Sequence, residues 1–293
     1  MGTVLPEIRR GKLKRLLECQ KKIRVAETVC GLEALAVNEA EKHSENRFDA
    51  LWFSGLCCSA FKGMPDNEYT DFSTRLRDIE NIFAVSDKPL IVDMDTGGMT
   101  THLCRHISEL EKTGVSGIVV EDKTGLKQNS LYGTGAVHIM ENSDVFSEKI
   151  YHSKKSIQSN EFMIFARTES LIAGETIEKA LCRTDKYIEA GADGIVIHSV
   201  RSDGSDVFGF ASEFRKKHEH IPLVFIPTAY HTFSGDELFE KGADVVIYAN
   251  QLMRSAYKAM ISQAVFILEN NRTDESACEP VGNILNAIDG KEF

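Results

Sequence analysis

The sequence lacks the features that would assign it to several large classes of protein. Its 7 cysteines form no Cys-x-x-Cys pair and no regular framework, and an odd number is typical of a reducing compartment. No apolar run approaches the roughly 20 residues that a membrane span requires, and the first residues lack the apolar core of a signal peptide. We therefore expect a cytoplasmic protein without a membrane anchor, in which the thiols are packed rather than bonded.

Positive charge is also scarce. The chain has 34 Lys and Arg against 44 Asp and Glu, which gives a formal net charge of −10. The acidic residues are spread along the chain, and there is no basic stripe of the kind that binds nucleic acid. We expect no nucleic-acid partner, and an anionic substrate would need cations placed locally.

What the sequence does contain is an alternation of short apolar runs with amphipathic stretches. The 293 residues, 42% of them hydrophobic, can fill the core of one large domain. The apolar runs are rich in β-branched residues and are far enough apart for one helix between each pair. Eight strands are predicted: Ile23–Glu27, Ala50–Phe53, Pro89–Asp93, Gly117–Glu121, Phe162–Arg167, Gly194–His198, Pro222–Ile226 and Asp244–Tyr248.

Three of these strands are preceded by the same joint between a helix and a strand. Gly114, Gly191 and Gly242 each stand shortly before an apolar run. A glycine there can adopt the left-handed conformation that ends a helix. Eight such βα units predict an α/β fold, a closed (β/α)8 TIM barrel, with the active site at the carboxyl ends of the strands. An open, doubly wound sheet is the alternative.

Carboxylates gather at the ends of two neighbouring strands. Asp93 and Asp95 lie two residues apart, on one side if the strand continues, and Glu121 from the next strand can approach them. Three carboxylates without His or Cys favour a hard divalent ion, most often Mg²⁺. The alternative for Asp93 and Asp95 alone is a pair of solvated loop acids.

Other polar residues follow the remaining strand ends. Arg167 is suited to bidentate capture of carboxylate or phosphoryl oxygens, or it forms an internal pair with Glu169. His198 is a hydrogen-bond donor, a general acid or a structural group. Gly55 lets the backbone approach an anion closely, or it forms a tight turn. The ten residues from Glu121 to Ser130, most of them polar or charged, come at the end of a buried strand, as catalytic loops in α/β enzymes often do.

These motifs resemble those of the phosphoenolpyruvate mutase and isocitrate lyase superfamily, and within it those of the phosphoenolpyruvate mutases. The resemblance extends from about Ala26 to Ala256. Its most specific part is the signature Glu-Asp-Lys, five residues, Asn-Ser, which is present from Glu121 to Ser130. Other blocks are similar too: Trp52–Leu56, Asp93–Gly97, Arg167–Gly174, Gly191–His198, Pro227–Tyr230 and Tyr248–Asn250.

The resemblance implies a role for each of three groups of residues. The ligands of Mg²⁺, bound directly or through water, would be Asp93, Asp95 and Glu121, with Asp66 close by. The pyruvate oxygens would bind the backbone of Ser54, Gly55 and Leu56 beneath the ring of Trp52. The migrating phosphoryl group would contact Arg167 and His198, under a gating loop that carries Lys127, Asn129 and Ser130.

The activity implied is that of an isomerase of phosphonate biosynthesis. Such an enzyme interconverts phosphoenolpyruvate and 3-phosphonopyruvate by Mg²⁺-dependent phosphoryl transfer within one molecule, which forms a C–P bond. One alternative is a phosphonopyruvate hydrolase, which releases pyruvate and phosphate. Another is a lyase acting on 2-methylisocitrate or oxaloacetate-like acids, but the Lys-Lys-Cys-Gly-His loop of that branch has no counterpart here. A third alternative is a barrel that serves only as a binding or assembly module. Such a protein is expected to lose the charged residues at the strand ends, but this sequence retains them.

The segment after the last strand is expected to be helical. Leu252–Leu268 and Val281–Ile288 are predicted helices, separated by the polar stretch Glu269–Glu279. We expect one barrel domain over residues 1–293, with a helical segment at 252–293. The resemblance implies a homo-oligomer, a dimer or tetramer, in which this helix is exchanged. One departure from the family lies at Gly97-Gly98-Met99, where many relatives have an aromatic residue between the glycines and then Asn.

Overall fold

A closed barrel of parallel strands forms the centre of the protein. The computed structural model describes residues 4–125, 127–135 and 137–290. The eight strands pair in chain order, and β1 closes the barrel by pairing with both β2 and β8. They are β1 (Ile23–Glu27), β2 (Ala50–Phe53), β3 (Leu90–Asp93), β4 (Gly117–Glu121), β5 (Met163–Thr168), β6 (Gly194–Ile197), β7 (Leu223–Phe225) and β8 (Val245–Tyr248). The predicted (β/α)8 barrel is confirmed, and the open sheet is wrong.

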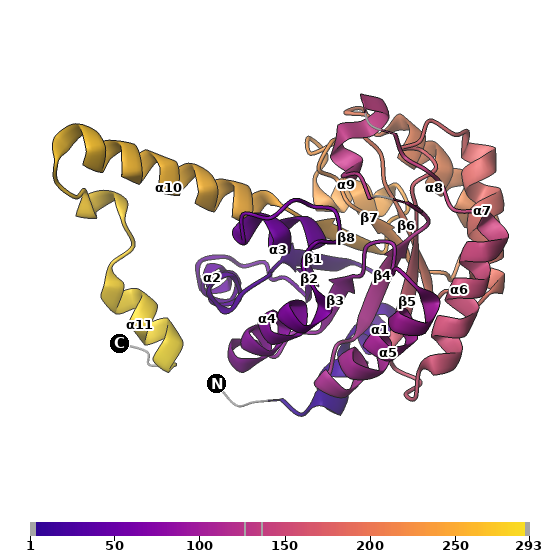
Figure 1. Cartoon of the computed structure of the whole chain (residues 1–293), viewed down its shortest axis with the longest axis horizontal. Helices are drawn as coiled ribbons and strands as arrows, with labels where there is room; N and C mark the ends of the chain where they lie inside the picture. The colour runs from indigo at the N-terminus through magenta and orange to yellow at the C-terminus, as the bar shows by residue number, and fades with distance from the viewer. Residues whose placement is uncertain (1–3, 126, 136, 291–293) are drawn as a thin grey trace.

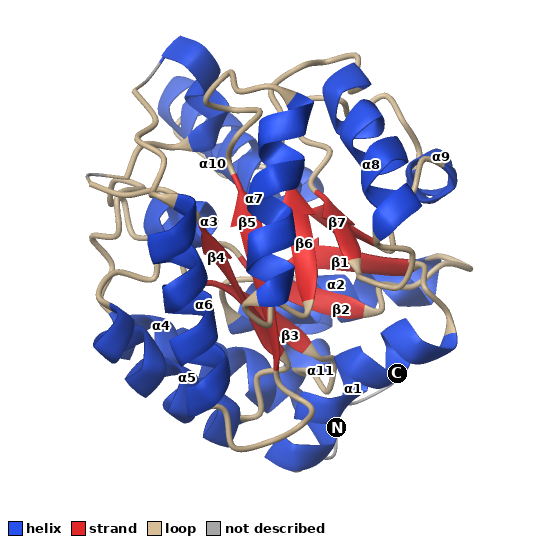
Figure 2. Ribbon diagram, turned by 90° about the vertical axis from the view of Figure 1, so that its right-hand side faces the viewer, coloured by secondary structure: helices blue, strands red, loops and turns tan. Residues whose placement is uncertain are grey.

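Helices surround the strands (Figure 2). The α-helices are α1 (Pro6–Cys19), α2 (Gly31–Ala40), α3 (Gly55–Phe61), α4 (Phe72–Val85), α5 (Thr100–Thr113), α6 (Ser143–Ser156), α7 (Ile177–Glu189), α8 (Ser205–Lys217), α9 (Gly235–Glu240), α10 (Gln251–Asn270) and α11 (Val281–Asp289). Short 3₁₀ turns are η1 (Glu41–His43), η2 (Ser130–Gly135) and η3 (Glu275–Ala277). The predicted glycine joints are confirmed, because Gly114, Gly191 and Gly242 have φ of 97°, 104° and 106°.

Alternate residues along each strand pack on opposite sides of the barrel wall. The interior cluster includes Ile91, Val119, Phe165 and Val196, and α1 contributes Leu13 to it at the amino-terminal end. The intervening residues pack outward in a second cluster that includes buried residues of the helices. Since side chains alternate with a period of two, the residue two positions beyond each interior one also faces the barrel axis. Those residues are Asp93, Glu121, Arg167 and His198.

The cysteines are unbonded, but not all are packed. All seven are free. Cys57 and Cys58 are fully buried, as predicted. Cys19, Cys182 and Cys278 are exposed, so the prediction of packed thiols is wrong for these three, which lie on outer helices and in the carboxyl-terminal segment.

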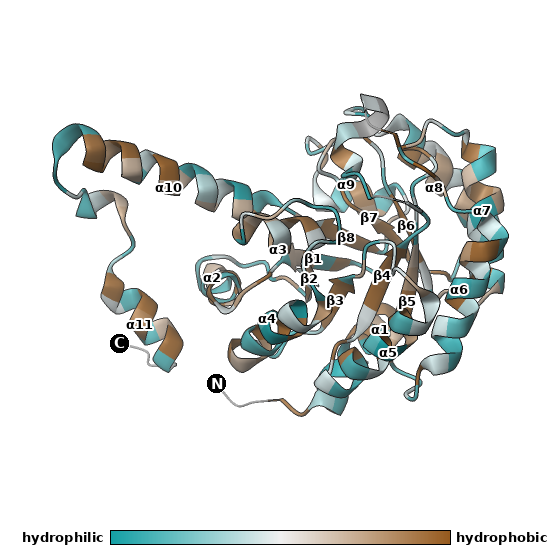
Figure 3. Cartoon of the chain, viewed as in Figure 1, coloured by the Kyte–Doolittle hydropathy of each residue, from teal (hydrophilic) through white to brown (hydrophobic). Residues whose placement is uncertain are grey.

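The carboxyl-terminal segment extends away from the barrel (Figure 1). The two predicted helices are confirmed as α10 and α11, and neither contains a buried residue. Their apolar side chains are exposed, for example Met260, Leu268, Val281 and Leu285. Hydrophobic positions, drawn in brown, recur along both helices (Figure 3). Among the residues that the structure describes, no helix combines the length and apolar character needed to cross a membrane.

Glu27 at the end of β1 anchors the first turn of α10. Its Oε1 accepts a hydrogen bond of 2.7 Å from the backbone N–H of Met253, while within the described chain its buried Oε2 has no hydrogen-bond partner. Burial raises the pKa of Glu27 to about 7, although the Met253 N–H opposes the shift. The folded protein therefore binds this proton more tightly than the unfolded chain does.

Replacing Glu27 with glutamine is expected to stabilise the protein above pH 7 and to have little effect below pH 4.5, the ordinary pKa of the group. Because the pKa of Glu27 is higher in the folded protein, the protonated carboxyl contributes to stability below pH 4.5, the pKa in the unfolded chain. This contribution is lost as the pH rises through 7. The neutral amide avoids this loss, which amounts to at most about 3 kcal/mol. Guanidinium denaturation at about pH 5 and pH 8 measures it. Glu45→Gln, at an exposed position, is the control; an equal change at both pH values for Glu27→Gln would contradict the explanation.

Candidate active site

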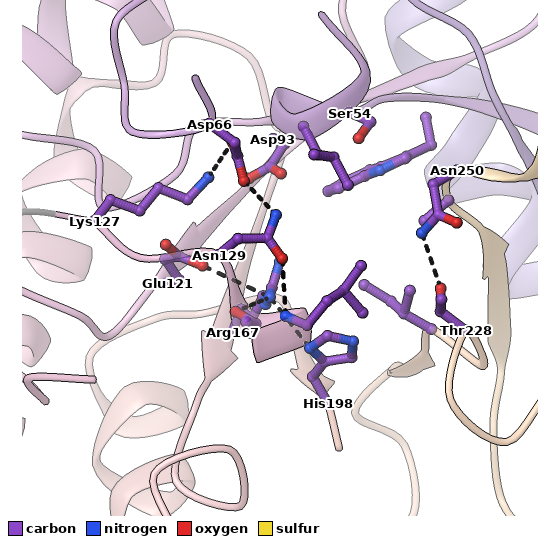
Figure 4. Close-up of a pocket in the computed structure, with 16 residues that line it drawn as sticks. Ser54, Asp66, Asp93, Glu121, Lys127, Asn129, Arg167, His198, Thr228 and Asn250 are labelled. Atoms are coloured by element: carbon purple, nitrogen blue, oxygen red, sulfur yellow. Dashed lines mark hydrogen bonds and ion pairs between the residues drawn. The ribbon is translucent and has the colours of Figure 1, made fainter. Parts of the chain in front are cut away.

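A pocket lies at the carboxyl ends of the strands (Figure 4). It is lined by Trp52, Ser54, Leu56, Asp66, Asp93, Glu121, Lys127, Asn129, Ser130, Leu131, Arg167, His198, Ile226, Thr228, Ala249 and Asn250. Strand ends from β2 to β8 therefore meet the loop that follows β4 at one place. All of the predicted site residues line this pocket except Gly55 and Asp95, which lie just behind it.

The turn after β3 is tied to its neighbours through the backbone. Asp93 accepts hydrogen bonds from the N–H groups of Asp95 at 3.1 Å and Gly55 at 3.3 Å. The carbonyl of Asp95, whose φ is 53°, accepts from the N–H of Glu121 at 2.8 Å. Gly55 is the first residue of α3 rather than part of a turn. A Cβ there would lie 2.7 Å from Asp95 Oδ1, so a glycine is required for this close approach.

The carboxylate of Asp95 is turned toward two cations. Arg75 Nη2 donates to Oδ2 at 2.5 Å, and Lys127 Nζ donates to Oδ1. Lys127 also pairs with Asp66 at 2.9 Å. The ammonium of Lys127 thus lies between the carboxylates of Asp66 and Asp95. Within the described ranges, no three His, Cys, Asp or Glu groups converge closely enough to hold a metal by themselves.

Three carboxylates line the pocket, those of Asp66, Asp93 and Glu121, and of these Asp66 is hydrogen-bonded to Lys127. Burial and the adjacent Asp95 raise the pKa of Asp93, and burial raises the pKa of Glu121 to about 7. Glu121 Oε1 is buried and, in the part of the chain that is described, accepts no hydrogen bond, although it forms an ion pair with Lys123 Nζ at 3.5 Å. The carboxylates of Asp93 and Glu121 are hard oxygen ligands and fit Mg²⁺. This ion is usually bound by one or two carboxylates and keeps several water molecules, which substrate oxygens can replace.

Asp95 shows the opposite electrostatic behaviour. Burial raises its pKa, but Arg75 and Lys127 outweigh burial and hold the pKa well below its usual range. Asp95 is therefore a permanently charged partner of two cations. Among the described residues, no cation is hydrogen-bonded to the carboxylates of Asp93 or Glu121, although Lys123 and Arg167 lie 3.5 Å and 3.7 Å from Glu121.

Arg167 and His198 form the opposite wall of the pocket. Arg167 forms ion pairs with Glu169 and, at 3.7 Å, with Glu121, so the predicted internal pair is present together with exposure to the pocket. Its Nη2 also donates to Ser130 Oγ at 2.9 Å and to His198 Nδ1 at 3.3 Å. Since a guanidinium can only donate, Nδ1 accepts and the proton of the neutral imidazole is on Nε2.

His198 is therefore a neutral donor at ordinary pH. Burial, with a contribution from Arg167, lowers its pKa to about 3. Its Nε2 has no hydrogen-bond partner among the residues described. Of the roles considered for this residue, hydrogen-bond donation from Nε2 into the pocket fits the structure, and general acid catalysis by an imidazolium does not.

The loop after β4 closes over the pocket through polar contacts. Asn129 Nδ2 donates to Asp66 at 2.6 Å, and Ser130 Oγ donates to Glu169 at 2.6 Å. The buried Lys123 donates to the carbonyl of Gln128 at 3.0 Å and to Ser130 Oγ at 2.9 Å. The signature residues on both sides of residue 126 are thus fixed to the strand ends that carry the charged groups.

Sequence reasoning missed two residues that support this arrangement. Asp122 accepts hydrogen bonds from the hydroxyl of Tyr187 at 2.6 Å and the N–H of Glu169 at 2.8 Å, and so holds the partner of Arg167 in place. Its place inside the Glu-Asp-Lys signature could have indicated it. Arg75 had no such signal, because it lies within an amphipathic helix far from any motif.

Comparison with known proteins identifies the family. The sequence profile described as phosphoenolpyruvate phosphomutase matches residues 23–268. The chain belongs to this family. It is 32% identical to a phosphoenolpyruvate phosphomutase of Tetrahymena pyriformis over 250 residues, which are 85% of this chain and 80% of that protein. It is also 34% identical to a phosphonopyruvate hydrolase of Variovorax sp. over 215 residues, 73% of each protein.

Crystal structures agree with the phosphomutase family assignment. A phosphoenolpyruvate phosphomutase from Streptomyces platensis subsp. rosaceus superposes with a TM-score of 0.86 at 29% identity, over 95% of this chain and 94% of that one. A phosphonopyruvate hydrolase in complex with oxalate and Mg²⁺ superposes with a TM-score of 0.85 at 27% identity, over 98% and 95%. The fold is common to mutase and hydrolase, so the choice between them depends on the site.

Proposed function

We propose that this protein is a phosphoenolpyruvate mutase, which interconverts phosphoenolpyruvate and 3-phosphonopyruvate. The observation that carries the proposal is the signature loop, whose Asn129 and Ser130 are hydrogen-bonded over a pocket that also contains Arg167 and Glu121. A mutase must retain the phosphoryl group beside the pyruvate enolate and keep water away from it, and a loop anchored in this way is suited to that task.

We propose Mg²⁺ as the cofactor. Asp93 and Glu121 would hold it, with Asp95 acting through water and Asp66 nearby. Two observations support a hard cation. Glu121 Oε1 accepts no hydrogen bond among the described residues, and the cluster of carboxylates contains no His or Cys. A bound Mg²⁺ would supply Lewis-acid stabilisation of the enolate and carboxylate charge of the substrate. The hydrolase of similar fold was crystallised with oxalate and Mg²⁺.

The residues of the chain would bind the two halves of the substrate separately. Trp52, with the backbone of Ser54, Gly55 and Leu56, would bind the pyruvate unit. Arg167, His198 Nε2–H and Asn129 would donate hydrogen bonds to the phosphoryl oxygens as the group moves between the enol oxygen and the methylene carbon. Each oriented donor of this kind typically stabilises a transition state by roughly 3 kcal/mol. Lys127 would neutralise the acidic side of the pocket when the loop closes.

Phosphonopyruvate hydrolase is the nearest alternative, and phosphorus NMR distinguishes the two. With phosphonopyruvate and Mg²⁺, the expected result is the appearance of the phosphoenolpyruvate resonance without steady growth of inorganic phosphate. Steady release of phosphate without phosphoenolpyruvate would reject the mutase. Release of pyruvate or glyoxylate from isocitrate-like or oxaloacetate-like acids at high turnover would instead indicate a lyase.

Replacing Asn129 with alanine is expected to slow phosphoryl transfer by about 100-fold to 1,000-fold, as the loss of one transition-state donor does. The side chain bonds Asp66 and not Asp93 or Glu121, so Mg²⁺ affinity should change little. Turnover is measured by phosphorus NMR and Mg²⁺ binding by calorimetry. Asn160→Ala, on the surface, is the matched control. Unchanged turnover in Asn129→Ala would contradict the role of the loop.

We also propose that the protein is a homo-oligomer, a dimer or tetramer, in which α10 and α11 pack on another subunit. Their apolar side chains are exposed, for example Tyr257, Ile261 and Leu268, which supports burial in an assembly. A monomeric mass in light scattering would reject this. We further propose that the chain forms one domain with a helical segment at 252–293 and that the protein is located in the cytoplasm.

A further inference from the structure

Arg75 lies behind the acidic side of the pocket, on the first turns of α4. It is only 6% exposed, and it belongs to a helix that contributes no pocket residue. Its neighbour on the same helix, Arg77, is exposed and bonds only Thr74 among the described residues. The two arginines therefore differ in environment although they are two residues apart.

The guanidinium of Arg75 bridges both ends of the Asp93-Met-Asp95 turn. Nη1 donates to the carbonyl of Asp93 at 3.0 Å, and Nη2 donates to the carboxylate of Asp95 at 2.5 Å. Asp95 is one of four described residues other than glycine with a positive φ, at 53°, a conformation that L-residues rarely adopt. The planar fork of an arginine can make both contacts at once, and the single ammonium of a lysine is a poorer match.

Each carboxylate oxygen of Asp95 therefore already accepts a hydrogen bond from a cationic side chain. Oδ2 is bonded by Arg75, and Oδ1 is bonded by Lys127 from the loop above. Of these two partners, Arg75 lies on helix α4 and Lys127 lies on the loop after β4, so the contact with Arg75 fixes the direction of the carboxylate from the barrel side. It also adds a permanent positive charge behind Asp93 and Glu121.

We propose that Arg75 is a positioning residue that directs Asp95 away from direct metal binding and toward Lys127, so that Asp93 and Glu121 hold the metal and Asp95 aligns the loop. The inference rests on the metal site proposed above. It deepens that proposal by giving the three acidic residues unequal roles. The positive charge of Arg75 weakens Mg²⁺ binding. Its two hydrogen bonds fix the turn after β3, and the oriented Asp95 carboxylate places Lys127.

Arg75→Met is expected to change affinity and turnover in opposite directions. Removing a buried positive charge close to the carboxylates should tighten Mg²⁺ binding by about tenfold. Loss of the bridge should lower kcat by about 10-fold to 100-fold, as the loss of an outer-shell partner does. Arg75→Lys keeps the charge but not the fork, so its Mg²⁺ affinity should stay near that of the wild type while kcat remains reduced. Arg77→Met is the matched control and should resemble the wild type in both.

Calorimetric titration of the metal-free protein with Mg²⁺ measures the affinity without any turnover. A residue that only stabilises the fold would give unchanged or weaker Mg²⁺ binding in Arg75→Met, and that result would overturn the inference. If wild-type protein binds no Mg²⁺, the proposed metal site itself fails, and the inference fails with it.

A second pair of variants tests the inference should Arg75→Met not fold. Asp95→Asn removes the carboxylate that Arg75 orients, and Asp93→Asn removes a proposed direct ligand. The expected loss of Mg²⁺ affinity is at most about tenfold for Asp95→Asn, from charge alone, and more than about 100-fold for Asp93→Asn. Equal losses for the two variants would show that Asp95 binds the metal directly and would overturn the assignment.

Discussion

Replacing Asp93 with alanine is expected to abolish turnover while leaving the fold intact. The carboxylate faces the pocket and bonds only two backbone N–H groups among the described residues, those of Gly55 and Asp95. If Asp93 is a direct ligand of Mg²⁺, as proposed, its loss should remove several kcal/mol of charge stabilisation, a decrease of at least about 1,000-fold in rate. Stability should change little, because removal of a charge that burial and Asp95 disfavour offsets the loss of the two backbone hydrogen bonds.

Turnover by phosphorus NMR and a thermal melt together test this expectation. Asp203→Ala is a suitable control, since Asp203 is an exposed acid on the loop after β6, outside the pocket. Unfolding of Asp93→Ala during purification would show that the barrel mouth is part of the stabilising core. More than a tenth of wild-type turnover would show that this carboxylate is dispensable.

Replacing Arg167 with methionine is expected to damage activity and stability together. The guanidinium is the buried partner of Glu169 and Glu121. Removing one member of a buried ion pair leaves charge without compensation, which costs about 3–5 kcal/mol. Turnover should fall by at least about 1,000-fold, because the proposed donation to the phosphoryl oxygens and the observed contacts with Ser130 and His198 would be lost together.

The contrast between two replacements separates these effects. Arg167→Lys keeps one positive charge beside Glu169, so it should recover much of the stability but little of the activity, since an ammonium cannot bridge several acceptors in a plane. Arg201→Met removes an exposed arginine whose partner is Asp203, and it should alter neither property. Equal activity in Arg167→Lys and the wild type would show that Arg167 contributes only a positive charge to the structure and that its planar guanidinium has no role in the reaction.

The barrel could be predicted because its signals are local. Each strand is a short β-branched run, and the left-handed glycines at 114, 191 and 242 mark where helices end. The period of two along a strand then places Asp93, Glu121, Arg167 and His198 on the same inner surface. To predict the position of these four residues, only the strand assignments and the direction of the chain are needed, and the sequence supplies both.

The parts that could not be predicted depend on long side chains that cross between elements. Arg75 reaches the turn after β3 from the outer helix α4, and no pattern within α4 distinguishes it from Arg77. The direction of Asp95 follows from that contact and from Lys127, which comes from a loop 32 residues away in sequence. Glu27 ends a strand as Glu121 does, yet it bonds the start of α10, because a helix begins beside it.

The single tryptophan of the chain gives the protein a built-in optical reporter. Trp52 is 1% exposed and lines the pocket, and no other indole is present among the 293 residues. Its fluorescence therefore originates wholly from the place where the substrate is expected to bind. Ligand entry and loop movement can be followed in real time on the unlabelled protein, and each spectral change can be assigned to one known side chain.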